Sequence, residues 1–267
     1  MIVMNLGLRV AAAVFSIPPE ALLPMLPLVM MEPKAINSEI ALRRKKFEEE
    51  VLPIAWNNVR DGFHVDDEWI VNRYQNEDDI ETAPPSTYGE VTVRGARQLF
   101  HFMDLYNRNH EKENKVEFWD LGSGVGRLVV QSFIEVPLLS RAVGMELCPS
   151  RHGMALRARS SVLDIVKTES SSLDFIQGDI LDTSNTITAT HIYVASLCFT
   201  AEMMHSLAYI LLSENNCPNI EVVASLQPIP FAGKKVPACR LEYVEMSWTP
   251  GQGSVVYIYD MKRRIDH

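Results

Sequence analysis

The stretch FWDLGSGVGRLVV, residues 118–130, decides the fold class of this chain. An apolar run closes on an acid, glycines follow at every second position, and a second aliphatic run comes after them. This pattern predicts a buried strand, a tight turn and a helix. A glycine turn of this kind lets the backbone approach a ligand at the carboxyl end of a strand. A plain tight turn in a stable core is the alternative interpretation.

The spacing of the glycines and the acid ahead of them bear on the ligand. A dinucleotide fingerprint is G-x-G-x-x-G, whereas the spacing here is G-x-G-x-G and position 127 is Arg. A carboxylate at Asp120 would repel a pyrophosphate. S-adenosylmethionine has no phosphate and carries a sulfonium and an ammonium. Four residues therefore favour S-adenosylmethionine over a nicotinamide dinucleotide: Asp120, Gly122, Gly124 and Gly126.

Strand and helix patterns alternate through the rest of the chain. Helix patterns at 126–136, 150–169 and 201–212 separate strand patterns at 116–121, 141–147, 172–180, 191–197 and 220–226. Alternation of this kind predicts a parallel, doubly wound sheet. Two last strand patterns, 239–248 and 254–261, flank the turn sequence TPGQG and predict an antiparallel hairpin. The predicted fold is α/β: a Rossmann-like sheet, mostly parallel with a C-terminal antiparallel hairpin, plus a helical N-terminal extension. By analogy, this layout resembles that of the class I methyltransferases.

The chain divides into three predicted regions. Residues 1–35 are apolar, too short and too broken by proline to span a membrane, and form either a targeting segment or a packing helix. Residues 36–115 are helical, with Pro53 kinking or ending a helix over 36–60, Thr92 capping a second helix, and a loop at 86–91. Residues 116–267 form the S-adenosylmethionine-binding α/β domain.

Composition narrows the classes of partner. A formal net charge of −9 argues against nucleic acid held by bulk electrostatics, so we expect no direct sequence-specific nucleic-acid binding. The basic run at 43–46 is followed at once by FEEE, which is typical of a solvated, self-compensating helix face. A basic partner is electrostatically permitted. The four cysteines are scattered along the sequence, so we predict neither a metal site nor a disulfide framework. We also expect that the chain is not an integral membrane protein.

Acids at two further strand ends extend the cofactor prediction. Glu146 closes the second strand pattern, where a carboxylate would accept the two ribose hydroxyls of a nucleoside. Asp179 follows Gly178 at the end of the third strand pattern and would read the adenine amino group, with Ile180 covering the ring. A strand-end Asp that serves only its own turn is the alternative for Asp179.

Several stretches together resemble the disruptor-of-telomeric-silencing family, the non-SET histone lysine methyltransferases. They are STYGEV at 86–91, FWDLGSGVGRLVVQ, VGMEL, FIQGDIL, IYVASLCFTAEMMHSL and the final hairpin. The tyrosine-glycine-glutamate loop discriminates most, because generic methyltransferases lack it. In that family the loop folds over the methionine end of the cofactor. The resemblance therefore implies four more cofactor-binding residues: Thr87, Tyr88, Gly89 and Glu90.

The resemblance also implies an activity, that of an S-adenosylmethionine-dependent histone lysine N-methyltransferase, a chromatin regulator acting on a histone or nucleosome in the nucleus. The family carries two asparagines and a Phe where this chain has Ala195, Ser196 and Leu197, and a Phe where it has Ile180. These departures leave other outcomes open: methylation of a small molecule or a non-histone protein, or cofactor binding without catalysis. The apolar N-terminus leaves an organelle or the cytoplasm open as the location.

A lysine acceptor would need a narrow apolar channel. Burial there lowers the pKa of the amine, so no dedicated base is compulsory. Tyr88, Ser196 and Phe199 are the candidates to line this channel, and packing in the core or in a loop is their alternative role.

Overall fold

A computed structural model of the chain describes residues 38–57, 89–106, 116–167, 172–232 and 235–266. Residues 36–267 form one compact unit. The predictions for the apolar segment 1–35 and for Thr87 and Tyr88 fall outside the described residues. The architecture below is that of the unit 36–267.

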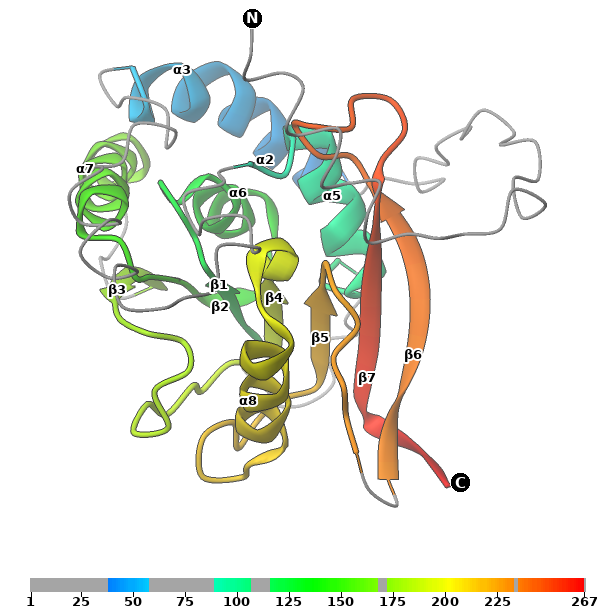
Figure 1. The fold of residues 1–267 in the computed structure, drawn as a ribbon. Coiled ribbons are helices and arrows are strands. Elements are labelled where there is room, and N and C mark those ends of the chain that lie inside the picture. Colours follow the sequence, from blue (N-terminus) through cyan, green and yellow to red (C-terminus); the bar gives the residue numbers. More distant parts are fainter. Residues whose placement is uncertain (1–37, 58–88, 107–115, 168–171, 233–234, 267) are drawn as a thin grey trace, which may run out of the picture. The chain divides into compact units, whose positions relative to one another are not determined.

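A seven-stranded sheet organises this unit (Figure 1). Its order is β3-β2-β1-β4-β5-β7-β6, with the first five strands of this order parallel and β7 antiparallel to both of its neighbours. The predicted class I methyltransferase sheet with a C-terminal hairpin is confirmed. The strands are β1 (Val116–Leu121), β2 (Leu139–Glu146), β3 (Leu173–Gln177), β4 (His191–Val194), β5 (Val222–Ser225), β6 (Lys235–Val244) and β7 (Ser254–Asp266).

Helices cover both faces of the sheet, which is why β1 reads as a nearly continuous apolar run. Trp119 and Leu121 point into a core cluster shared with α8, whereas Phe118 points into a cluster shared with α5. A third cluster joins α6 and α7 to the segment from α2 to α3. The helical elements are α2 (Ser38–Lys46), η2 (Phe47–Val51), α3 (Leu52–Ala55), α5 (Val93–Phe102), α6 (Arg127–Glu135), α7 (Pro149–Val166), η4 (Ser196–Cys198) and α8 (Ala201–Leu212).

The first helical segment passes through Pro53 without ending there. Immediately before the proline, residues Phe47–Val51 adopt a π-helical turn, and the N–H of Leu52 bonds the carbonyl of Phe47. Pro53 then occupies the first turn of α3, directly after the π-helical turn, and the first turn is the part of an α-helix that best tolerates proline. The prediction that Pro53 kinks or ends the helix is therefore refined: a change of helical register accommodates it.

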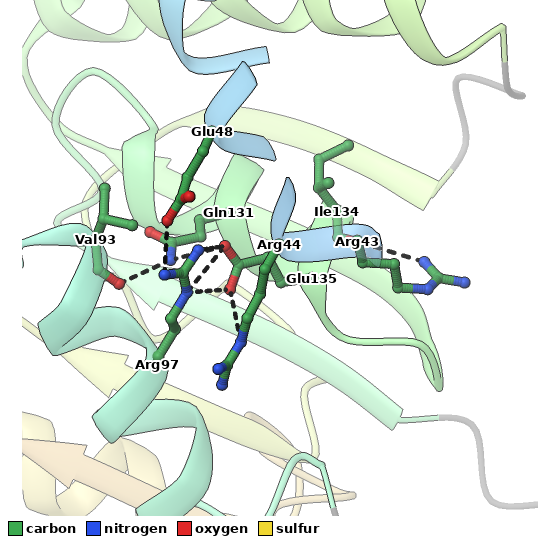
Figure 2. A network of polar contacts seen from close by, with 8 residues as sticks. All are labelled: Arg43, Arg44, Glu48, Val93, Arg97, Gln131, Ile134 and Glu135. Carbon is green, nitrogen blue, oxygen red and sulfur yellow. Dashed lines mark hydrogen bonds and ion pairs between the residues drawn. The ribbon is translucent and has the colours of Figure 1, made fainter. Parts of the chain in front are cut away.

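Buried charge attaches this helical segment to the α/β core (Figure 2). The carboxylate of Glu135, at the end of α6, is fully buried and accepts hydrogen bonds from Arg97 of α5, the shortest at 2.8 Å. Arg97 also pairs with Glu48 of η2 at 2.7 Å. Gln131 donates to Glu135 and to the carbonyl of Val93. Helices from the N-terminal region and from the α/β half thus share one polar network.

Several strand boundaries differ from the sequence prediction, and the ends of β4 and β6 are two of them. The fourth strand ends at Val194, because residues Ser196–Cys198 form a 3-10 turn whose carbonyls accept from the side chain of Gln227. The hairpin strands are β6 (Lys235–Val244) and β7 (Ser254–Asp266), so the connection begins four residues earlier than the pattern 239–248 suggests. Thr92 caps α5 as predicted, its hydroxyl accepting from the N–H of Gly95 at 3.0 Å.

Candidate cofactor site

The turn after β1 is held against the end of β2 by backbone hydrogen bonds. The N–H groups of Gly122 and Ser123 both donate to the carbonyl of Met145, at 2.8 and 3.0 Å. Gly126 ends the turn at φ +86°, and a Cβ there would lie 2.5 Å from the ring of Phe175 on β3. Glycine is therefore required twice over at position 126, by the left-handed backbone and by the close approach of α6 to the sheet.

Glu146, at the end of β2, lies directly beneath this turn and is buried. Its Oε2 accepts from the N–H of Gly124 and its Oε1 from the N–H of Cys148, both at 2.8 Å. The carboxylate thus joins the glycine turn to the start of α7. Its predicted contact with the ribose hydroxyls stays a prediction.

Asp120, the last polar residue of β1, is 4% exposed. Its Oδ1 has no hydrogen-bond partner among the described residues. Burial, followed by the charge of Glu146, raises the pKa of this carboxyl to about 8. Tyr193 is its parallel partner on β4, and burial and the charge of Asp120 raise the pKa of that phenol too. A buried carboxylate oxygen without a donor suits a ligand that brings positive charge.

A pocket opens over the turn and gathers several of the predicted residues. Gly89 and Glu90 of the loop and Asp120, Gly122 and Gly124 of the turn line it together. The remaining lining residues are Val91, Ser123, Arg127, Leu128, Tyr193, Ala195 and Trp248. The structure therefore brings the predicted loop and the predicted turn to one cavity, although they are distant in sequence.

The segment after β6 fixes the described part of the loop. Val91 forms an antiparallel bridge with Met246, and Glu90 exchanges two hydrogen bonds with Ser247, at 3.0 and 2.8 Å. A Cβ on Gly89 would lie 2.3 Å from the indole of Trp248, so this glycine is required by close packing. The loop reaches the pocket because the hairpin connection holds it there.

Asp179 and Ile180 lie in the turn after β3 and are not among the residues that line the pocket. The Oδ1 of Asp179 accepts from the N–H of Leu181 at 2.9 Å, and its carbonyl accepts from the side chain of Asn185. Ile180 is 9% exposed and belongs to the core cluster around α8. Asp179 thus stabilises its own turn through these hydrogen bonds. Recognition of adenine by Asp179 and Ile180 stays a prediction.

Ser196 and Phe199, the described candidates for an acceptor channel, also lie outside the pocket lining. The hydroxyl of Ser196 is fully buried, 2.8 Å from that of Ser225, and accepts from the N–H of Gln227 at 3.0 Å. Phe199 packs partly buried against the core cluster of α8. Ala195 is the residue of this segment that lines the pocket. A channel role for Ser196 and Phe199 stays a prediction.

Six lining residues were missed by the sequence prediction: Val91, Ser123, Arg127, Leu128, Tyr193 and Trp248. Arg127 stands at the first position of α6, where the dinucleotide fingerprint has its third glycine, and this departure was the available signal. Tyr193 lies inside an apolar strand and Trp248 in a turn beyond one, so neither is marked out locally.

A family model described as "Histone methylation protein DOT1" matches residues 70–252, more than half of the sequence. The chain belongs to the DOT1 histone methylation family. The resemblance inferred from the sequence is thereby confirmed, and the chain is an S-adenosylmethionine-dependent methyltransferase. No curated protein sequence matches it.

Solved structures with similar folds are distant. TrmK of M. capricolum, solved with S-adenosyl-homocysteine, has 12% identity and a TM-score of 0.42 over 64% of this chain and 70% of its own. TrmN from Thermus thermophilus has 14% identity and a TM-score of 0.44, covering 62% and 47% respectively. The putative methyltransferase yhhF from Escherichia coli has 14% identity and a TM-score of 0.44, covering 66% and 87%. The chain thus spans about half the length of TrmN.

The residues present fit S-adenosylmethionine, the cofactor of this DOT1-family chain. Asp120 offers a carboxylate oxygen without a donor to a positively charged ligand. Because the glycines of the turn have no side chains, a ligand can come close to the backbone there. The acids Asp120 and Glu90 in the pocket lining disfavour a ligand that carries phosphate. Within the described ranges, no cluster of metal-binding side chains occurs. The helices described there are also too short or too polar to cross a bilayer.

Proposed function

We propose that this DOT1-family chain methylates lysine side chains of histones. The observation that carries the proposal is the convergence of Gly89 and Glu90 with Asp120 at one pocket, in a chain of the histone methylation family. The loop that distinguishes this family in the sequence therefore covers the same cavity as the glycine turn that receives the cofactor.

When bound, S-adenosylmethionine supplies an electrophilic methyl group on a sulfonium. Asp120 would provide the counter-charge for the cationic part, and its burial strengthens that attraction. Gly89 and Trp248, which pack closely together, both line this pocket. In-line transfer then requires a neutral amine held in a water-poor opening, where desolvation lowers its pKa.

The charge of the chain supports a basic acceptor. With a formal net charge of −9, the protein attracts lysine- and arginine-rich segments and repels nucleic acid. A histone substrate places the activity in the nucleus, and we propose that location with it.

The test is a methylation assay with labelled cofactor and three acceptors: nucleosomes, free core histones and a small-molecule extract. We expect label on a histone lysine. Gly124→Arg should abolish the labelling, because its side chain would fill the pocket lined by the turn. Gly153→Arg is the matched control, since Gly153 lies on α7, outside the pocket lining, and its Cβ position meets no atom closer than 3.8 Å.

A second candidate is methylation of a small molecule or a non-histone protein. It is favoured by the segment after β4, where the family's asparagines are replaced: Ala195 brings no polar group to the pocket, and the hydroxyl of Ser196 is engaged by Ser225 and Gln227. Label in the extract alone would rule out the histone proposal and support this one. Cofactor binding without label on any acceptor would indicate a binding protein that has lost catalysis.

A further inference from the structure

The side chain of Gln227 holds the segment that follows β4. Gln227 comes two residues after the end of β5. Its Nε2 donates to the carbonyls of Ser196, Leu197 and Phe199, at 2.7, 2.8 and 3.2 Å. An amide nitrogen carries two N–H bonds, so the three carbonyls share them. One side chain beyond β5 thus fixes the backbone of the turn η4 and of the residue after it.

Two serine hydroxyls add a second connection between the same strand ends. Ser196 and Ser225 are fully buried, and their hydroxyl oxygens lie 2.8 Å apart. The N–H of Gln227 donates to the hydroxyl of Ser196 at 3.0 Å, and the hydroxyl of Ser225 donates to the carbonyl of Gln227 at 2.7 Å. Because Ser225 uses its one proton on this carbonyl, Ser196 donates to Ser225. Neither hydroxyl therefore has a proton left to donate to a substrate.

The residue just before this held segment, Ala195, belongs to the wall of the pocket. Its N–H donates to the carbonyl of Leu121, at the end of β1, at 3.3 Å. Its Cβ lies 3.8 Å from the position that a Cβ on Gly122 would occupy. Ala195 therefore faces the glycine turn across the boundary between β1 and β4. The hydrogen bonds of Gln227 begin at the next residue, so they set the position of this wall.

The order of the strands indicates which ligand this wall meets. The order β3-β2-β1-β4-β5 reverses between β1 and β4, and in open α/β sheets the ligand crevice lies at such a reversal. The residues predicted to bind the cofactor, Asp120, Glu146 and Asp179, stand at the ends of β1, β2 and β3. The side of the crevice formed by the ends of β4 and β5 is therefore left for the methyl acceptor.

We propose that Gln227 is a positioning residue for methyl transfer, because it fixes the segment whose first residue, Ala195, forms the acceptor side of the pocket. The inference rests on the proposed methyl transfer at this pocket. In that reaction the lone pair of the acceptor forms a bond to the methyl carbon while the sulfur–methyl bond breaks. The electron pair of the broken bond stays on sulfur, and a proton of the methylated amine passes to water. A misplacement of about 1 Å costs such an in-line reaction on the order of 100-fold in rate.

Gln227→Glu tests the inference, because it keeps the length of the side chain, removes both N–H donors and places a charge beside three carbonyl oxygens. For core histones we expect kcat to fall about tenfold or more and KM to stay within about twofold, because alignment is lost and binding outside the wall is kept. Calorimetry with S-adenosylhomocysteine should give the wild-type stoichiometry, which shows that the loss of kcat is not a loss of folded protein.

Two further variants separate the donor from the mere presence of a side chain. Gln227→Lys supplies an ammonium with three N–H donors and should return kcat to within about threefold of wild type. Asn219→Asp is the matched control: it removes an exposed amide that donates to the carbonyl of Thr188 at 3.3 Å and adds the same charge outside the pocket lining. It should change neither kcat nor KM.

Hydrogen exchange of backbone amides gives a measurement that needs no acceptor. The N–H of Phe199 donates to the carbonyl of Ser196 at 3.0 Å, the same carbonyl that Gln227 holds. This amide should exchange about tenfold faster in Gln227→Glu than in wild type, and at close to the wild-type rate in Gln227→Lys.

Three results would overturn the inference. They are an unchanged kcat in Gln227→Glu, a kcat in Gln227→Lys as low as in Gln227→Glu, and unchanged exchange at Phe199. Label in the small-molecule extract alone would overturn only the histone proposal, and the same kinetic comparison is then made with that acceptor. Label on no acceptor would overturn both proposals.

Discussion

At the scale of single residues, Asp120 shows how a ligand requirement is built into a core strand. Its main chain belongs to β1, yet its carboxylate is buried beside a second acid, Glu146, and one of its oxygens has no donor among the described residues. Neither burial nor a like charge favours the ionised form. In the ligand-free protein the ionised form of Asp120 is therefore unfavourable, and a cationic cofactor bound beside it would stabilise that form.

Asp120→Asn should remove the part of the pH dependence of the free energy of unfolding that comes from this carboxyl. A carboxyl whose pKa is raised to about 8 keeps its proton in the folded protein, whereas in the unfolded chain it ionises near about 4. Stability from this group is therefore complete at acid pH and is lost as pH rises towards 8. Relative to wild type, the ligand-free Asn variant should gain on the order of a few kcal/mol at pH 8.5 and almost nothing at pH 4. Denaturant unfolding measures both; equal curves at the two pH values would contradict the assignment.

The same group should make cofactor binding pH-dependent with the opposite sign. Binding a cation requires ionised Asp120, so affinity for S-adenosylmethionine should rise between pH 6 and 7.5, by at most about tenfold per pH unit. In Asp120→Asn the affinity should be weaker and flat across this range. Calorimetric titrations at several pH values check it, and the same slope in both proteins would refute it.

At the scale of elements, the fold depends on a buried ion network as well as on apolar packing. Glu135 of α6, Arg97 of α5 and Glu48 of η2 join three separate elements (Figure 2). Burial alone would lower the pKa of Arg97, but its hydrogen bonds and charge contacts with Glu135 and Glu48 raise it above its ordinary value. The guanidinium therefore stays charged, and removal of Glu135 leaves a partly buried cation with less counter-charge.

Glu135→Gln should lower the free energy of unfolding by about 2 to 4 kcal/mol, because it neutralises the fully buried member of the network. Glu39→Gln is the matched control: it neutralises an exposed acid paired with Arg43 on α2 and should cost less than about 1 kcal/mol. Urea denaturation of both variants makes the comparison. Similar small losses would show that the network contributes little beyond its surface counterpart.

At the scale of the whole molecule, net charge selects the kind of partner. An excess of acids gives the protein a formal charge of −9, and histones are strongly basic. The electrostatic attraction between such partners is long-range, and dissolved salt weakens it. The Debye length is about 8 Å at physiological ionic strength. Added salt should therefore weaken the binding of the acceptor more than it slows the methyl transfer itself.

We accordingly expect the KM for free core histones to rise roughly threefold or more between 50 and 300 mM NaCl, with kcat nearly unchanged. Steady-state assays over this range give the two constants separately. A KM that does not move with salt, or a kcat that falls instead, would argue against long-range attraction to a basic acceptor.

The fold and the floor of the site were accessible from the sequence because their signals are local. The strand, the glycine turn and the helix of residues 118–130 lie in one continuous stretch, and Asp120, Gly122 and Gly124 reach the pocket as part of it. Pro53 was harder to place, because a π-helical turn that absorbs a proline leaves no distinct pattern in the residues themselves.

The sequence by itself thus determined the class of fold, the order of strands and helices and the glycine turn, since periodicity and turn chemistry are read over a few neighbouring residues. Only the tertiary structure decided which side chains share the pocket. The guanidinium of Arg127 lies over the ring of Trp56, and the N–H of Glu90 donates to the hydroxyl of Ser247. The hydroxyl of Ser196, expected at an acceptor channel, accepts instead from the N–H of Gln227. Each of these contacts joins separate elements, so it exists only once the sheet and its helices have packed.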